Sequence, residues 1–81
     1  LRMSQKIIYI STPLEGEIGK IETDDILKSL VDYFGVFPKN ARIYKDDVCK
    51  INDITPTNDA EINALSQEKE IFVVLYANDA I

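Results

Sequence analysis

The sequence predicts an α+β domain in which a mixed sheet of four to five strands carries one main helix on one face. Two observations predict it: the continuous apolar run of residues 70–77 and the helical spacing of apolar residues within 26–34. Both alternating sets of the run are apolar, which is typical of a strand inside a sheet. A buried helix is the alternative, but the shortness of the run and its β-branched and aromatic side chains favour a strand.

Length and composition limit the class of protein. The chain has 81 residues, 46% hydrophobic residues and a net charge of −5, which indicates one small folded domain. The negative charge argues against general nucleic-acid binding, because that needs a basic face. No apolar run approaches the roughly 20 residues that span a bilayer, and no signal peptide is recognised, so direct membrane insertion is not expected. The single cysteine, Cys49, is typical of a reducing compartment, and we expect a cytoplasmic protein.

Local composition divides the rest of the chain into short elements. In chain order we predict a flexible lead-in over residues 1–5, a strand over 6–11, a turn over 12–16, a weak strand over 17–22, a helix over 26–34, a connector over 36–40, a short strand over 41–44, a turn over 45–47, a second short strand over 48–51, a loop over 55–59, a short helix over 60–65 and the last strand over 70–77. The folded domain is therefore expected to comprise residues 6–81.

The first two strands are expected to form a hairpin of unequal partners. The first is rich in β-branched and aromatic residues, which favour extended backbone. The turn after it contains Pro13, which fixes φ, and Gly16, which permits positive φ. The second strand is weak, because only Ile18 and Ile21 are apolar and Gly19 lowers strand propensity. We therefore expect it at the edge of the sheet.

The helix over residues 26–34 has one apolar stripe and recognisable ends. Thr23 is predicted as its N-cap, with the carboxylates of Asp24 and Asp25 in the first turn, where they complement the positive end of the helix. Gly35 is predicted as the C-terminal cap. The predicted stripe consists of Ile26, Leu27, Leu30, Val31 and Phe34, and the predicted solvent side of Lys28, Ser29 and Asp32.

The second half of the chain is expected to supply the neighbours of the last strand. The loop over 55–59 ends in helix-capping residues, and the short helix after it would direct Ile62 and Leu65 inward. If the first and last strands pair in parallel at the centre of the sheet, the arrangement is a β-grasp. A ferredoxin-like split βαβ unit is the alternative, but it needs a longer second helix.

Three places in the chain follow a family pattern. They are the helix over 26–34 with a short connector into 41–44, the Pro-containing loop over 52–57 before the short helix at 60–65, and the closing residues 75–79 with a Tyr and a polar tail. This pattern resembles ubiquitin-like proteins, and among them the autophagy-type modifiers, over residues 6–81. GABARAP-type members have two further helices before the first strand. Members of the autophagy-protein-twelve type consist of little more than the ubiquitin-like core after a disordered leader. The short lead-in of this sequence favours a resemblance to that type.

The resemblance implies a ubiquitin-like β-grasp fold and a non-catalytic role in a ubiquitin-like conjugation pathway of autophagy. The implied partners are an autophagy-protein-five-like conjugation partner or an E2-like enzyme. Members of the family are conjugated through a C-terminal glycine, whereas this sequence stops at Ile81. Two expectations stay open: a glycine follows Ile81 in the natural protein, or the partner is bound non-covalently through the sheet face and the C-terminal tail.

Six positions are candidates for partner binding: Lys20, Ile21, Tyr44, Phe72, Tyr76 and Ile81. The first two fall on the expected edge strand, which can accept an extended peptide as an added strand, and the family binds short hydrophobic motifs in this region. For Ile21, packing under the helix is an equal alternative. The three aromatic residues would form a patch on the sheet face away from the helix, and Ile81 belongs to the tail.

No group of residues indicates catalysis, a metal or a cofactor. The chain has no histidine, so Cys49 lacks a base, and we expect a structural or surface role for it. Asp46, Asp47 and Asp53 do not have the spacing of a calcium loop. Because nothing assembles a nucleophile, a base and an oxyanion hole, we do not expect an enzyme.

A self-association module, cut from a larger scaffold or regulatory protein, is the alternative function. Asp46, Asp47 and Asp59 would then pair head to tail with Lys20 of another copy, through ion pairs that salt screens. A small acidic regulator with a ferredoxin-like fold is a third possibility.

Overall fold

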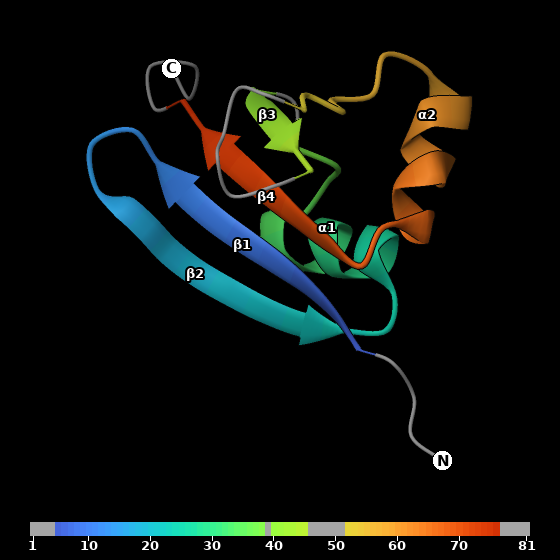
Figure 1. Ribbon diagram of the computed structural model, residues 1–81, viewed down its shortest axis with the longest axis horizontal. Coiled ribbons are helices and arrows are strands. Elements are labelled where there is room, and N and C mark those ends of the chain that lie inside the picture. The colour runs from blue at the N-terminus through green and yellow to red at the C-terminus, as the bar shows by residue number, and fades with distance from the viewer. Residues whose placement is uncertain (1–4, 39, 46–51, 77–81) are drawn as a thin grey trace.

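The computed structural model describes residues 5–38, 40–45 and 52–76. The helices and strands are, in order, β1 (Lys6–Thr12), β2 (Gly16–Thr23), α1 (Ile26–Phe34), β3 (Ala41–Tyr44), α2 (Asp59–Ala64), the 3₁₀-helix η1 (Leu65–Gln67) and β4 (Glu70–Leu75). The four strands form one mixed sheet in the order β2-β1-β4-β3. Helix α1 covers one face of this sheet, and α2 lies beside the sheet rather than across it (Figure 1).

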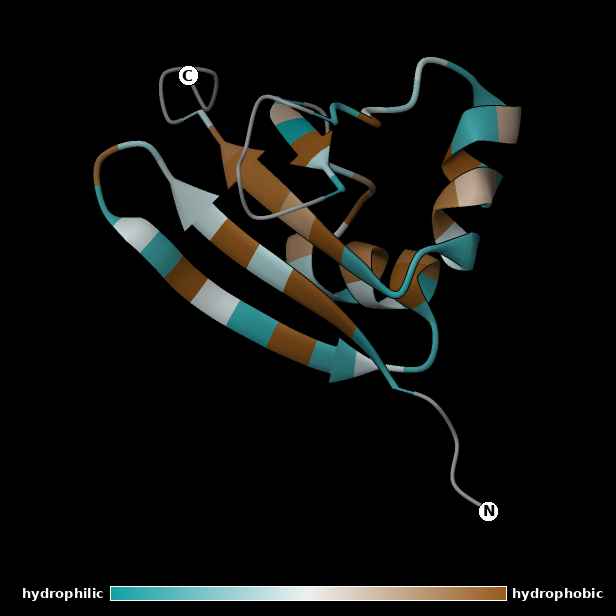
Figure 2. Cartoon of the chain, viewed as in Figure 1, coloured by the Kyte–Doolittle hydropathy of each residue, from teal (hydrophilic) through white to brown (hydrophobic). Residues whose placement is uncertain are grey.

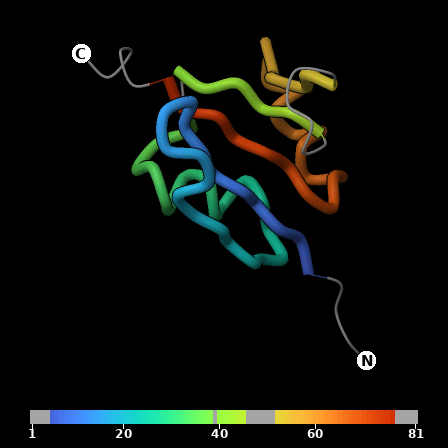
Figure 3. The backbone as a smooth tube through the Cα atoms, turned by 60° about the vertical axis from the view of Figure 1, so that its left-hand side comes forward, coloured from blue at the N-terminus to red at the C-terminus, as the bar shows by residue number. Residues whose placement is uncertain are grey.

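Strands β1 and β4 lie side by side at the centre of the sheet and run in the same direction (Figures 1 and 3). Ile8 is opposite Ile71, and Ile10 is opposite Val73. All four side chains are fully buried, because α1 packs over them. The predicted α+β class, the parallel centre and the main helix on one face are therefore confirmed, and the arrangement is compatible with a β-grasp.

The outer strands run antiparallel to the central pair. β2 pairs with β1, with a register shift between Ile10 and Ser11, and β3 pairs with β4. Asp53 adds a single bridge to Tyr44 at the outer side of β3. The predicted strand over 48–51 lies outside the described residues. A ferredoxin-like fold needs a helix between its first two strands, whereas a hairpin joins β1 to β2 here, so that alternative is wrong.

The N-cap of α1 is Asp25 and not Thr23, so the predicted cap is wrong by two residues. The Asp25 carboxylate accepts a hydrogen bond from the backbone N–H of Lys28 at 3.1 Å. Thr23 is the last residue of β2, and its hydroxyl oxygen accepts from the backbone N–H of Asp25 at 3.0 Å. At the other end Gly35 has a φ of +87° and donates to the carbonyl of Val31, which confirms the predicted C-terminal cap.

The buried side of α1 is narrower than the predicted stripe. Ile26 and Leu30 are fully buried, and Leu27 and Phe34 pack around them. Val31 is 42% exposed, because it lies about 100° around the helix from Leu30 and points to the flank.

The predicted solvent side of α1 is correct at two of three positions. Lys28 and Asp32 are exposed and form an ion pair at 3.0 Å. Ser29 is half-buried instead, because its hydroxyl donates to the Thr23 hydroxyl oxygen at 2.7 Å. Apolar and polar residues alternate along much of β1 and β2, whereas apolar residues are nearly continuous along β4 (Figure 2).

The short helix α2 begins with a side-chain cap. The Asn58 side chain accepts a hydrogen bond from the backbone N–H of Glu61 at 2.9 Å, and the Glu61 carboxylate accepts one from the backbone N–H of Thr57 at 2.8 Å. Leu65, in the 3₁₀ turn that follows, is buried against the core, and Ile62 is half-buried. The predicted short helix and the inward position of Leu65 are confirmed, whereas Ile62 is only half-buried.

We expect Leu30→Ala to lower the free energy of unfolding by about 2–5 kcal/mol, because truncation of this fully buried side chain leaves a cavity in the core. Val31→Ala changes the neighbouring residue, which is 42% exposed, and should lower it by less than about 1 kcal/mol. Urea unfolding of both variants measures the difference. Equal losses would contradict the orientation of α1 on the sheet.

Candidate functional site

The sheet face away from α1, called the open face below, carries a row of side chains that crosses all four strands. Lys20 of β2 is opposite Tyr9 of β1. Phe72 of β4 has two opposite neighbours, Tyr9 on one side and Tyr44 of β3 on the other. Directly opposed residues direct their side chains to the same face of a sheet. We call Lys20, Tyr9, Phe72 and Tyr44 the aromatic row.

The middle of the aromatic row is a stacked pair of rings. The centroids of Tyr9 and Phe72 are 4.6 Å apart, and the ring planes differ by only 6°. The ammonium group of Lys20 lies 5.8 Å from the centroid of the Tyr9 ring, within the range of a cation–π interaction. Tyr9 and Phe72 are half-buried, so part of each ring meets solvent. The open face therefore presents flat aromatic surface with a positive charge at its β2 end.

The third aromatic residue of the row, Tyr44, presents little surface. Its side chain is buried, at 6% exposure. This burial raises the pKa of the Tyr44 phenol, and a side-chain hydrogen bond with Tyr76 raises it further. The predicted patch of Tyr44, Phe72 and Tyr76 thus lies on the predicted face, but Phe72 and Tyr76 are its accessible members.

Sequence reasoning missed Tyr9. The available signal was the alternation of β1, in which Tyr9 stands between Ile8 and Ile10 and must face away from them. Alternation alone did not show that Tyr9 would face Phe72, because that depends on the register of two strands about 60 residues apart in the chain.

Ile21 does not join the aromatic row. It faces the other side of the sheet, opposite Ile8, and packs against the core, so the stated alternative of packing under the helix is observed. Ile81, like the carboxylates of Asp46 and Asp47, lies outside the described residues.

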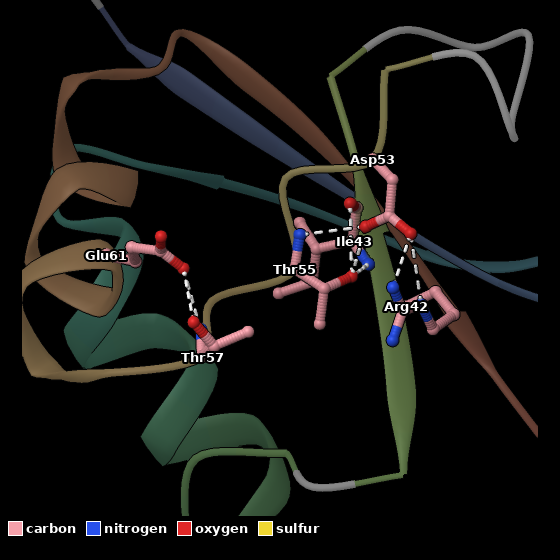
Figure 4. A network of polar contacts seen from close by, with 6 residues as sticks. All are labelled: Arg42, Ile43, Asp53, Thr55, Thr57 and Glu61. Carbon is pink, nitrogen blue, oxygen red and sulfur yellow. Dashed lines mark hydrogen bonds and ion pairs between the residues drawn. The ribbon is translucent and has the colours of Figure 1, made fainter.

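A polar network fastens the segment after β3 to that strand (Figure 4). Two nitrogens of the Arg42 guanidinium donate to one carboxylate oxygen of Asp53, at 3.1 and 2.5 Å. The backbone N–H and the hydroxyl of Thr55 donate to the other oxygen of Asp53, at 2.9 and 2.6 Å. The Thr55 hydroxyl oxygen accepts from the backbone N–H of Ile43 at 2.8 Å. We call Arg42, Asp53 and Thr55 the loop clamp.

The loop clamp changes the acidity of Asp53. Partial desolvation raises the pKa of this carboxyl group, but the hydrogen bonds from Thr55 and Arg42, together with the charge of Arg42, outweigh it. The pKa of Asp53 falls from 3.8 to about 2. The hydrogen bond to Asp53 and the negative charge of that carboxylate in turn raise the pKa of Arg42. Asp53 is therefore ionised at neutral pH and acts as a structural anchor.

A groove of about 360 Å³ lies between the loop clamp and α2. Its lining residues are Asp53, Ile54, Thr55, Glu61, Ala64, Leu65 and Glu68. Each of its carboxylates already has a partner: Arg42 for Asp53, Thr57 for Glu61, and Lys45 at 4.0 Å for Glu68. Each carboxylate of this groove therefore interacts with a neighbouring side chain of the same chain.

Residues 5–38, 40–45 and 52–76 contain no cluster of three or more His, Cys, Asp or Glu side chains arranged to hold a metal ion. Within the same ranges no helix has the length and apolar character to cross a membrane. Cys49 is outside these ranges.

We expect Asp53→Asn to lower the free energy of unfolding at pH 7 by about 1 kcal/mol, a value reduced because solvent screens this partly exposed pair. The pKa of Asp53 is lower in the folded chain than in the unfolded chain. Its contribution is therefore complete well above pH 3.8 and is lost as the pH falls toward 2. Urea unfolding should show the difference from wild type shrinking between pH 5 and pH 2.

The control for this variant is Asp32→Asn, which removes the exposed ion pair with Lys28. It should change the free energy of unfolding by less than about 0.5 kcal/mol at every pH. A difference for Asp53→Asn that stays constant from pH 5 to pH 2 would show that its pKa is not lowered.

Comparisons of the chain with protein-family models, with curated proteins and with solved structures gave no match. The ubiquitin-like resemblance over residues 6–81 therefore stays a prediction.

Proposed function

We propose that this chain is a non-catalytic protein-interaction domain with a ubiquitin-like β-grasp fold, and that it binds its partner with the open face of the sheet. The observation that carries the proposal is the stacked pair of Tyr9 and Phe72, which leaves aromatic surface in contact with solvent on the face that α1 does not cover.

The β-grasp assignment is supported by the strand order β2-β1-β4-β3, with a parallel pair at the centre and antiparallel strands on both sides. It is also supported by the position of α1, which connects the hairpin to β3 and packs on one face. In this arrangement α1 covers one face of the sheet, and on the other face the rings of Tyr9 and Phe72 stay partly exposed.

The chemistry of the open face is suited to a protein partner. Tyr and Phe are enriched in protein–protein interfaces, because they bury a large area and lose few rotatable bonds. Lys20 at the β2 end supplies a positive charge that suits an acidic group on the partner. Tyr76 extends the aromatic surface past the end of β4, toward the C-terminal tail.

The class of partner follows from the resemblance to autophagy-type modifiers. We propose an autophagy-protein-five-like conjugation partner or an E2-like enzyme, met in the cytoplasm. Attachment would be covalent where a glycine follows Ile81, and non-covalent otherwise.

The test mixes the natural full-length protein with the purified autophagy-protein-five-like protein of the same organism. We expect co-elution on size exclusion, and a Kd that Tyr9→Ala raises by about tenfold, because the variant removes one ring of the stacked pair. Tyr33→Ala is the matched control: it removes a Tyr that is 50% exposed on α1, and it should leave the Kd unchanged.

Two outcomes would count against the proposal. Absence of co-elution would contradict the proposal that the partner is of the autophagy type. Binding that Tyr9→Ala and Tyr33→Ala weaken equally, in variants that keep the wild-type circular dichroism spectrum, would remove the open face as the binding surface.

A further inference from the structure

The outer edge of β2 pairs with no other described strand, because β2 ends the sheet and its only partner is β1 (Figure 1). Such an edge presents a row of backbone N–H and C=O groups to which another strand can add. On the open face this edge carries Lys20 and Glu22, both exposed, and neither forms an ion pair with another described residue. On the opposite face it carries Ile21, which is half-buried.

We propose that the partner of this edge is a second copy of the chain, bound with the two β2 strands antiparallel and Lys20 of each copy opposite Glu22 of the partner subunit. The two four-stranded sheets would then form one continuous sheet. This inference does not rest on the proposed function: both involve the Lys20 side chain, but the dimer pairs through the backbone edge of β2, and its association is measured without any other protein.

Symmetry restricts the possible registers. Two identical strands that pair antiparallel are related by a two-fold axis perpendicular to the sheet, so both α1 helices lie on the same side. Each residue then faces a residue that points to the same side of its own sheet. Lys20 and Glu22 point to the open face, and Ile21 points to the helix face. Every allowed register is therefore centred on a residue that faces itself.

Charge selects one of these registers. A register centred on Lys20 opposes two ammonium groups, and one centred on Glu22 opposes two carboxylates, both of which destabilise the pair. A register centred on Gly19 places Lys20 against Ile18, where β2 shifts its register with β1. Only the register centred on Ile21 brings Lys20 and Glu22 together, and it does so twice.

The proposed interface is small, because the regular part of β2 comprises residues 19–23. Interfaces of this size belong to the weak, transient class. The net charge of −5 on each copy also opposes association. We therefore expect dimers only at protein concentrations of roughly hundreds of micromolar or above, a range that sedimentation equilibrium reaches.

The test exchanges the charges between two variants. In a homodimer of Lys20→Glu, both cross-strand pairs between positions 20 and 22 place two carboxylates opposite each other. In a homodimer of Glu22→Lys, the same pairs place two ammonium groups opposite each other. Each variant alone should show a Kd for dimerisation at least about tenfold above wild type. An equimolar mixture should form a heterodimer with a Kd within about threefold of wild type, because every charge again faces its opposite.

A second mixture controls for net charge. Lys69→Glu and Glu15→Lys change exposed residues outside residues 19–23 and alter the net charge by the same amounts. The more negative charge of Lys69→Glu should weaken dimerisation slightly and the less negative charge of Glu15→Lys should strengthen it slightly, with both Kd values within about threefold of wild type. If they lose and regain association in the same way as the β2 variants, net charge explains the result and the proposed register is wrong.

Hydrogen exchange of the wild-type chain gives an independent readout that needs no variant. Raising the concentration from micromolar to millimolar should slow exchange at outward-facing backbone amides of residues 19–23 and leave β3 unchanged. A wild-type chain that is monomeric at about 1 mM, or a mixture of Lys20→Glu and Glu22→Lys that does not associate while wild type does, would overturn the proposal.

Discussion

The parallel pairing of β1 with β4 is the constraint on which the rest of the structure depends. It brings the start and the end of the chain together, and α1 covers one side of it. Once Ile8 and Ile10 are committed to the core with Ile71 and Val73, alternation commits the residues between them to the other side. The open face is therefore a direct product of the core, and Tyr9 and Phe72 stack there because their strands are fixed in register.

Much of this arrangement is visible in the sequence, because hydrophobic periodicity is a local signal. Three signals each extend over only a few residues: the apolar run that forms β4, the helical spacing of Ile26 and Leu30, and the glycine after α1. The errors have local causes as well. Thr23, Asp24 and Asp25 are all good capping residues, and the choice among them depends on where β2 ends.

The parts that were not predicted depend on contacts between distant residues. The stacking of Tyr9 on Phe72 requires the register of a parallel pair, which composition does not encode. The loop clamp joins Arg42 to Asp53, 11 residues away in the chain. Nothing in the spacing of these two residues distinguishes an ion pair from two solvated charges. Ile21 could be assigned to either side only once the pairing of β2 with β1 was known.

The uneven distribution of tyrosines gives the chain a built-in optical probe. It has four tyrosines and no tryptophan, so tyrosine supplies nearly all of its ultraviolet fluorescence. Tyr9, Tyr44 and Tyr76 lie on the open face, and Tyr33 lies on α1. Replacing Tyr33 with Phe would leave an emission spectrum that comes from one side of the sheet alone. Events at that surface could then be followed in the unlabelled protein.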